Sequence, residues 1–178
     1  MMACGSAPLP VATPAATPSA TGTAAAATGC GQVARMPDLG RTHINSQSYP
    51  YPQHPATSGP HYPEWYVVPP QVFATAIQET RAVHNLEHGY VIVYYSAGSE
   101  APLAPAVVAT LAGRVNGQHK VLMAPYPQLP PGSSLALAAW DELQLCDSTV
   151  TPELAKAALD KFIASFREAA LAPESAAP

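Results

Sequence analysis

Clustered histidines are the main chemical signal of this sequence. Five of its six histidines lie within 46 residues. They are His43, His54, His61, His84 and His88. Imidazole is a common ligand of transition metals and titrates near neutral pH, so the cluster indicates a metal site, acid–base chemistry or pH sensing. The alternative is that these rings hydrogen-bond backbone carbonyls in a loop that is short of donors, and the sequence leaves both interpretations open.

The pentapeptide HNLEH, residues 84–88, carries the sharpest pattern. In a helix, positions i and i+4 share a face, so His84 and His88 can hold one ion between them. The same letters match the H-x-x-E-H signature of inverted zinc peptidases. Gly89 and an apolar strand follow at once, and the downstream acidic residues lack a ligand-like arrangement, so we favour metal binding without peptidase chemistry. Glu87 is expected to orient an imidazole or a neighbouring backbone group.

A second segment, TSGPH at residues 57–61, presents another imidazole close to Trp65. Two remote segments that each carry histidines are the sequence form of a three- or four-ligand site. The expected core ligands from these two segments are His61, His84 and His88. We expect copper first and zinc second, since copper ranks above zinc in divalent affinity. Met123 is expected in the core, although a thioether near the cluster would favour copper.

Hydrophobic patterning predicts the elements that position these side chains. Strands are predicted over residues 66–68, 90–96, 120–124 and 135–145, and helices over residues 105–112 and 152–166. Residues 71–80 fit either a short helix or a strand, and the proline- and tyrosine-rich residues 35–64 read as an ordered loop. The fold class is therefore α+β: a single domain with a small mixed sheet, two main helices and a long Pro/aromatic-rich N-terminal loop.

The chain divides into three parts by composition. Residues 1–30 are rich in Ala, Thr and Pro and read as a disordered linker, residues 31–174 as the domain, and residues 175–178 as a tail. Ala3-Cys4-Gly5-Ser6 resembles the end of a bacterial lipoprotein signal, in which the cysteine is lipidated. The apolar stretch that normally precedes it is missing, so the true start codon lies upstream, the chain has been trimmed, or Cys4 is incidental.

The remaining cysteines are Cys30 and Cys146, which we expect to form a disulfide in an oxidising compartment. Two unrelated buried thiols are the alternative. Charge excludes other classes: the 178 residues carry a net charge of −4 with no Lys/Arg cluster, so no nucleic-acid partner is expected. No apolar run is long enough for a transmembrane helix. G-x-S-x-G, phosphate-loop, dinucleotide and C-x-x-C motifs are absent from the sequence.

Several of these stretches together resemble one bacterial family, "domain of unknown function 3105". The resemblance rests on PATSGPH (residues 55–61), Trp65, VHNLEHGYVIVYY (residues 83–95), the stretch 140–146, and a helix with Phe162 and Phe166. It covers roughly residues 31–174 and departs from the family pattern at Ala56 and Tyr90. It implies an extracytoplasmic, membrane-tethered protein with imidazoles at His43, His61, His84 and His88, and no established activity. With this resemblance, His43 is the expected fourth metal ligand.

These observations lead to one expected function and two alternatives. We expect an extracytoplasmic metal-binding domain, tethered to the membrane through a lipid on Cys4, with a copper or zinc ion as cofactor and a protein partner that the sequence does not identify. A metal-free envelope interaction module is the second interpretation. A metal-dependent enzyme is the third, because three ligands would leave an open position, whereas four would serve storage, transfer or stabilisation.

Overall fold

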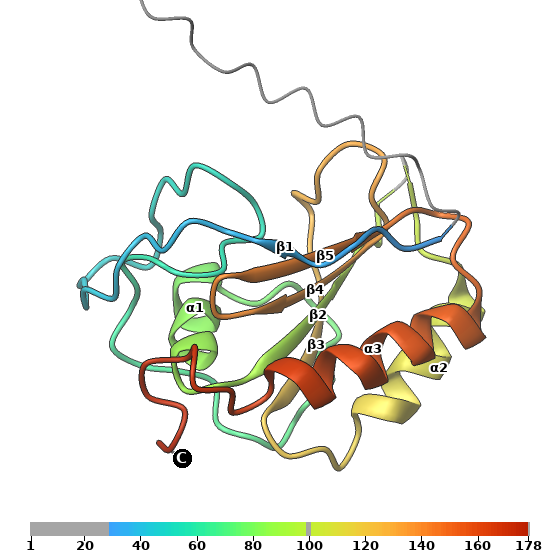
Figure 1. The fold of residues 1–178 in the computed structure, drawn as a ribbon. Helices are drawn as coiled ribbons and strands as arrows, with labels where there is room; N and C mark the ends of the chain where they lie inside the picture. Colours follow the sequence, from blue (N-terminus) through green and yellow to red (C-terminus); the bar gives the residue numbers. More distant parts are fainter. Residues whose placement is uncertain (1–28, 99–100, 178) are drawn as a thin grey trace, which may run out of the picture.

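The structure is a computed structural model that describes residues 29–98 and 101–177, so Cys4 lies outside the described residues. These residues form one five-stranded sheet and three helices (Figure 1). The strands are β1 (Ala34–Arg35), β2 (Val91–Tyr95), β3 (Val121–Pro125), β4 (Leu135–Ala139) and β5 (Glu142–Cys146). The helices are α1 (Glu79–Glu87), α2 (Pro105–Val115) and α3 (Pro152–Phe166).

The sheet is mixed, with strand order β1-β5-β4-β2-β3. Strands β2 and β3 are parallel and are connected through α2, whereas the other neighbours are antiparallel. Parallel neighbours need a long crossover connection, which the helix α2 provides. The α+β class and the mixed sheet predicted from the sequence are confirmed, and the short helix α1 adds to the two main helices.

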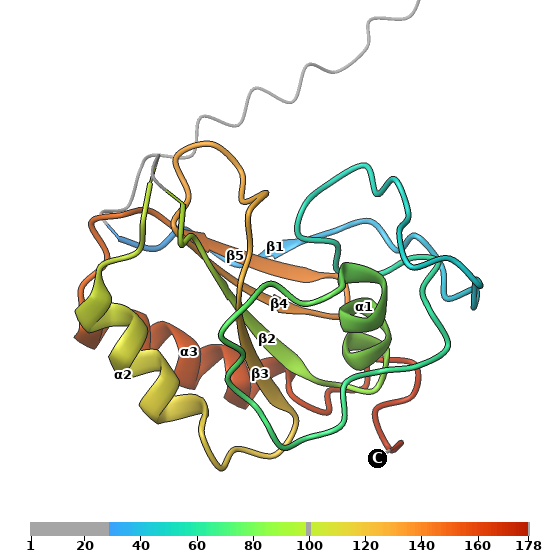
Figure 2. The same ribbon diagram turned by 180° about the vertical axis from the view of Figure 1, so that it is seen from behind.

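Each face of the sheet packs against a different layer, as the two opposite views show (Figures 1 and 2). Helices α2 and α3 cover one face, where Val91 and Val93 of β2 join their apolar side chains. Helix α1 and the N-terminal loop cover the other face, where Ile92 and Tyr94 are buried. Alternate residues of a strand point to opposite faces, so the continuous apolar run of β2 serves both cores.

Local sequence signals account for the position of helix α3. Helix α3 begins after Thr151, whose side-chain oxygen accepts a hydrogen bond from the Leu154 N–H at 3.3 Å, with Pro152 at the first helical position. Such a cap satisfies one of the free N–H groups at a helix start. The buried stripe of α3 includes Leu159 and Phe162, which pack on the sheet together with α2.

Two predicted strands differ from the structure. Residues 135–145 form the hairpin β4–β5 rather than one strand, because the chain turns at Asp141, where φ is +55°. Residues 66–68 form no strand, since the Asn85 side chain takes both backbone hydrogen bonds of Tyr66, at 2.8 and 2.9 Å. Residues 71–80 are mostly irregular and make a single bridge between Val72 and Met123 before α1 begins.

Cys30 and Cys146 form a disulfide across 116 residues, which ties the segment before β1 to the end of β5. The C-terminal residues also contact the domain, because the buried Lys120 ammonium donates hydrogen bonds to the carbonyls of Ser175 and Ala177. None of the helices in the described part of the chain combines the length and the apolar character that a membrane span requires.

Candidate metal centre

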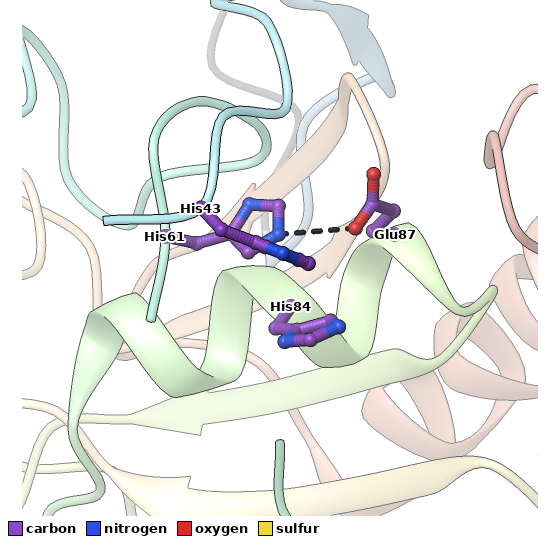
Figure 3. Close-up of side chains that lie close together, drawn as sticks. All are labelled: His43, His61, His84 and Glu87. Carbon is purple, nitrogen blue, oxygen red and sulfur yellow. Dashed lines mark ion pairs between the residues drawn. The ribbon is translucent and has the colours of Figure 1, made fainter. Parts of the chain in front are cut away.

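Four side chains from three segments converge at the α1 side of the sheet (Figure 3). They are His43, His61, His84 and Glu87. Each offers one ligand-type atom, and these atoms all lie within 4.8 Å of one another. The His43 residue is exposed, whereas the other three are buried. The grouping therefore forms at the boundary between the core and solvent.

The two loop histidines are held together by backbone pairing. The Ile44 N–H donates to the His61 carbonyl at 2.8 Å, and the His61 N–H donates to the Thr42 carbonyl at 3.0 Å. Gly59 makes the turn before His61 with φ at +122°, and a Cβ there would lie 3.1 Å from the Tyr51 ring. Only glycine fits such a conformation and such a close approach without strain.

Helix α1 provides the other two side chains. His84 and Glu87 are three residues apart and so share a face of the helix. The helix also buries Val83 and Leu86 in the core cluster that includes residues of the sheet. The helix is held in this orientation by its apolar side chains, which leaves His84 and Glu87 turned toward the loop that carries His61 (Figure 3).

Backbone carbonyls orient both buried imidazoles. The Nδ1 atom of His61 lies 2.8 Å from the Gly59 carbonyl oxygen, and that of His84 lies 2.9 Å from the Tyr62 carbonyl oxygen. A carbonyl only accepts, so each Nδ1 carries the hydrogen and each Nε2 keeps a lone pair. This is the usual state of a histidine that binds a metal, with the second nitrogen donating to a carbonyl or carboxylate.

The Nε2 atom of His61 faces a buried carboxylate. It lies 3.0 Å from Oε2 of Glu87, and the two side chains are 0% and 3% exposed. The two atoms do not meet the geometry of a hydrogen bond, and neither has a hydrogen-bond partner elsewhere among the described residues. Ligand atoms of a tetrahedral ion at about 2.0–2.2 Å are roughly 3.3–3.6 Å apart, close to this spacing. A cation between them would satisfy both atoms.

Burial sets the protonation of these groups. It lowers the pKa of His61, and it lowers the pKa of His84 to about 4 against the opposing hydrogen bond to Tyr62. Burial and the nearby Glu174 carboxylate raise the pKa of Glu87 to about 7. Desolvation disfavours every charged form. At neutral pH the buried imidazoles are therefore neutral, which is the form that binds a metal, and Glu87 is the group that a cation would ionise.

One protein family matches this chain, described as protein of unknown function (DUF3105), over residues 43–178. The chain belongs to the DUF3105 family. The family resemblance inferred from the sequence is confirmed. No curated protein and no solved structure matches the chain. The matched region of this DUF3105 member begins at His43 and contains all four clustered side chains.

The cluster of four side chains differs in one respect from the ligand set expected from the sequence. The structure brings together His43, His61 and His84, but Glu87 and not His88 completes the group of mutually close ligand atoms. Helix α1 ends at Glu87, and His88 is its C-cap residue. The His88 ring packs against Trp65 and His84, at 4.6 and 4.7 Å between ring centroids, and its Nε2 lies 3.4 Å from Oε2 of Glu174.

The sequence signal for Glu87 is its spacing from His84. Spacing of three residues places a side chain on the same helix face as His84, just as spacing of four does. Glu87 was expected to orient an imidazole, whereas the structure points its oxygen at the shared centre of the cluster. The donor set is three nitrogens and one oxygen, and it is compatible with binding a metal ion.

Proposed function

We propose that this protein binds one divalent transition metal ion, zinc or copper, through His43, His61, His84 and Glu87. The observation that carries the proposal is the pair of buried imidazoles whose Nδ1–H groups are taken by backbone carbonyls. Each Nε2 thereby keeps a lone pair; that of His61 lies 3.0 Å from the buried Glu87 oxygen, and His84 contributes a ligand-type atom to the same group. Without a metal, the buried His61 Nε2 and Glu87 Oε2 have no hydrogen-bond partner among the described residues, which is costly for buried polar atoms.

The donor types favour a divalent ion over copper(I). Imidazole and carboxylate suit Zn²⁺ and Cu²⁺, whereas copper(I) prefers sulfur ligands. Met123 belongs to the core between the sheet and helices α2 and α3, while α1 packs on the opposite face. Its thioether therefore does not reach the cluster. The cysteines Cys30 and Cys146 are consumed in a disulfide.

Four protein ligands favour binding over catalysis. Catalytic zinc sites keep a position open for water or substrate, whereas four-coordinate sites stabilise or store the ion. His43 is the exposed member and pairs with the buried part of the site through backbone bonds beside His61. The ion would enter from this side, with His43 closing over it as the last ligand.

The proposal also locates the protein outside the cytoplasm. Disulfides persist in oxidising compartments, and the Cys30–Cys146 bond supports such a location. A lipid on Cys4 would tether the domain to a membrane through the Ala/Thr/Pro-rich residues that follow. Mass spectrometry of protein isolated from its natural membrane tests this part separately, since a diacylglyceryl group adds a defined mass to the peptide that contains Cys4.

The metal proposal is tested on protein purified without a histidine tag. Elemental analysis is expected to find about one zinc or copper per chain, and His84→Ala is expected to lose it. The matched control is His119→Ala, because His119 is 66% exposed and pairs with Glu168 outside the cluster. Equal metal content in His84→Ala and His119→Ala would contradict the site.

Trp65 offers an independent readout. Its ring centroid lies 5.2 Å from that of His84, whereas the second tryptophan, Trp140, is buried in the core beneath α1. Cu²⁺ bound at the cluster is expected to quench Trp65 fluorescence in the wild type and in Trp140→Phe. A chelator that leaves fluorescence and melting temperature unchanged in metal-loaded protein would instead support the metal-free interaction module.

A further inference from the structure

A separate cavity lies at the start of α1, formed by residues 47–51, His54, residues 76–80 and residues 126–128. Its volume is about 440 Å³. The proposed metal site contributes none of its four side chains to this wall. Cavities of this size hold small organic molecules, typically between apolar walls with a few placed polar groups.

One polar group in the wall of this cavity is the imidazole of His54, which is held in a fixed orientation. The Nδ1 atom of His54 lies 3.0 Å from Oε2 of Glu79 and 2.9 Å from the Tyr126 hydroxyl oxygen. Glu79 also accepts from the Tyr126 hydroxyl at 2.5 Å and from the Ala56 N–H at 2.8 Å. Burial, reinforced by Glu79, raises the pKa of Tyr126 well above its usual value, which keeps this phenol protonated and donating.

The contacts of Nδ1 decide which His54 nitrogen is available. Because Nδ1 faces a carboxylate, it carries the hydrogen in the neutral ring. Nε2, across the ring, then has a bare lone pair, and no hydrogen bond to it exists among the residues that the structure describes. The His54 side chain is 31% exposed, so a molecule in the cavity can reach it.

Most other polar groups of the wall already have partners. The Tyr51 hydroxyl donates to the Pro60 carbonyl at 2.6 Å, and the Thr80 hydroxyl donates to the Gln47 carbonyl at 3.1 Å. The Gln78 amide donates to the Thr80 oxygen at 2.8 Å. These three side chains therefore offer a ligand little further hydrogen bonding.

Ring side chains make up much of the remaining wall. Three tyrosine rings and two proline rings line it, from Tyr49, Pro50, Tyr51, Tyr126 and Pro127. Tyr49 and Tyr51 lie 5.0 Å apart between ring centroids, and Tyr49 is 38% exposed at the edge. Among the described lining residues there is no lysine or arginine to pair with a carboxylate or a phosphate. The wall therefore suits a flat, uncharged aromatic body.

We propose that this cavity binds a neutral phenol, with its ring among the tyrosines and prolines and its hydroxyl donating to Nε2 of His54. A phenol remains protonated at neutral pH and brings one polar group to the one oriented acceptor. Glu79 is a positioning residue, since it holds the His54 ring in the tautomer that accepts. The proposal does not depend on metal binding at the other site.

The test uses phenol, toluene and benzoate as probes. Imidazole signals of isotope-labelled, metal-free protein are followed by NMR during each titration. Phenol is expected to shift the His54 signal in a saturable manner, and toluene to bind about tenfold more weakly, because it lacks the hydrogen bond. Benzoate is expected to bind more weakly than phenol. Equal affinities for phenol and toluene, or no shift at His54, would overturn the proposal.

Two variants separate the hydrogen bond from the aromatic wall. His54→Ala is expected to weaken phenol binding about tenfold and to leave toluene binding unchanged. Tyr49→Ala removes an edge ring that the fold does not bury, and it is expected to weaken both probes. His119→Ala serves as the control and should change neither. Unchanged phenol affinity in both cavity variants would contradict the site, even if the His54 signal moves.

Discussion

Replacing Glu87 by glutamine has opposite expected effects on the metal-free and the metal-bound protein. Glu87 is 2% exposed, and its pKa rises from 4.5 to about 7 in the folded protein, mainly through burial. A raised folded pKa stabilises the folded state below about pH 4.5, and this contribution is lost as the pH rises through 7. The loss amounts to about 3 kcal/mol once both states are ionised.

Glutamine keeps the shape of the side chain but never ionises. Metal-free Glu87→Gln is therefore expected to lie within about 1 kcal/mol of the wild type at pH 5 and to exceed its free energy of unfolding at pH 8 by up to about 3 kcal/mol. Added zinc is expected to reverse the order at pH 8, because the wild type gains an anionic ligand that the variant lacks. Urea unfolding at both pH values, with chelator and with zinc, measures all four states.

The control is Glu153→Gln, which removes one exposed carboxylate from the first turn of α3. It should leave the response to zinc unchanged. The reasoning would be refuted if metal-free Glu87→Gln lost the same stability at pH 5 and at pH 8, since Glu87 would then hold the fold through ordinary contacts. An equal zinc response in Glu87→Gln and in the wild type would remove Glu87 from the ligand set.

Three further outcomes follow from the structure. Burial lowers the pKa of His84 from 6.5 to about 4. The metal-free wild type should therefore be more stable above pH 6.5 and lose this contribution as the pH falls through 4. His84→Gln should flatten that part of the pH profile of urea unfolding. Cys30→Ser is expected to lower the free energy of unfolding by about 2–5 kcal/mol, measured by denaturation without reductant, because it opens a loop of 116 residues. Gly89→Ala is expected to lower the melting temperature and to reduce the free energy of unfolding by roughly 1–3 kcal/mol. The reason is that φ of Gly89 is +80° and a Cβ there would lie 3.0 Å from Cα of Glu168. Gly98→Ala is the control, because no atom lies within 4 Å of its Cβ position.

Local patterns in the sequence predicted most of the regular elements. The apolar run at β2, the helical stripe of α3 with its Thr151 cap, and the α2 helix are all recognisable from neighbouring residues. The periodicity of a helix or a strand is a property of a short window, so the sequence is sufficient there. The hairpin turn at Asp141 lacked the usual glycine or asparagine and was missed for that reason.

Long-range contacts were predictable only where few combinations existed. With Cys4 set apart, a single pairing of the other two cysteines remained, and the structure contains that disulfide. His54 offered no comparable signal, because its partners Glu79 and Tyr126 are 25 and 72 residues away. Only the packing of the loop on α1 and on the end of β3 brings the three together.

The sequence by itself determined the chemical types available to the candidate metal site: imidazoles on two segments and a carboxylate in the HNLEH pentapeptide. It favoured His88 as the ligand and Glu87 as an orienting residue, although both lie on the helix face of His84 by spacing. The tertiary structure brings Glu87 into the group of mutually close ligand atoms, whereas His88, the C-cap residue of α1, contacts Trp65 and Glu174. Ligand geometry depends on the direction of each side chain in space, and that direction is set by how the helix and the loops pack.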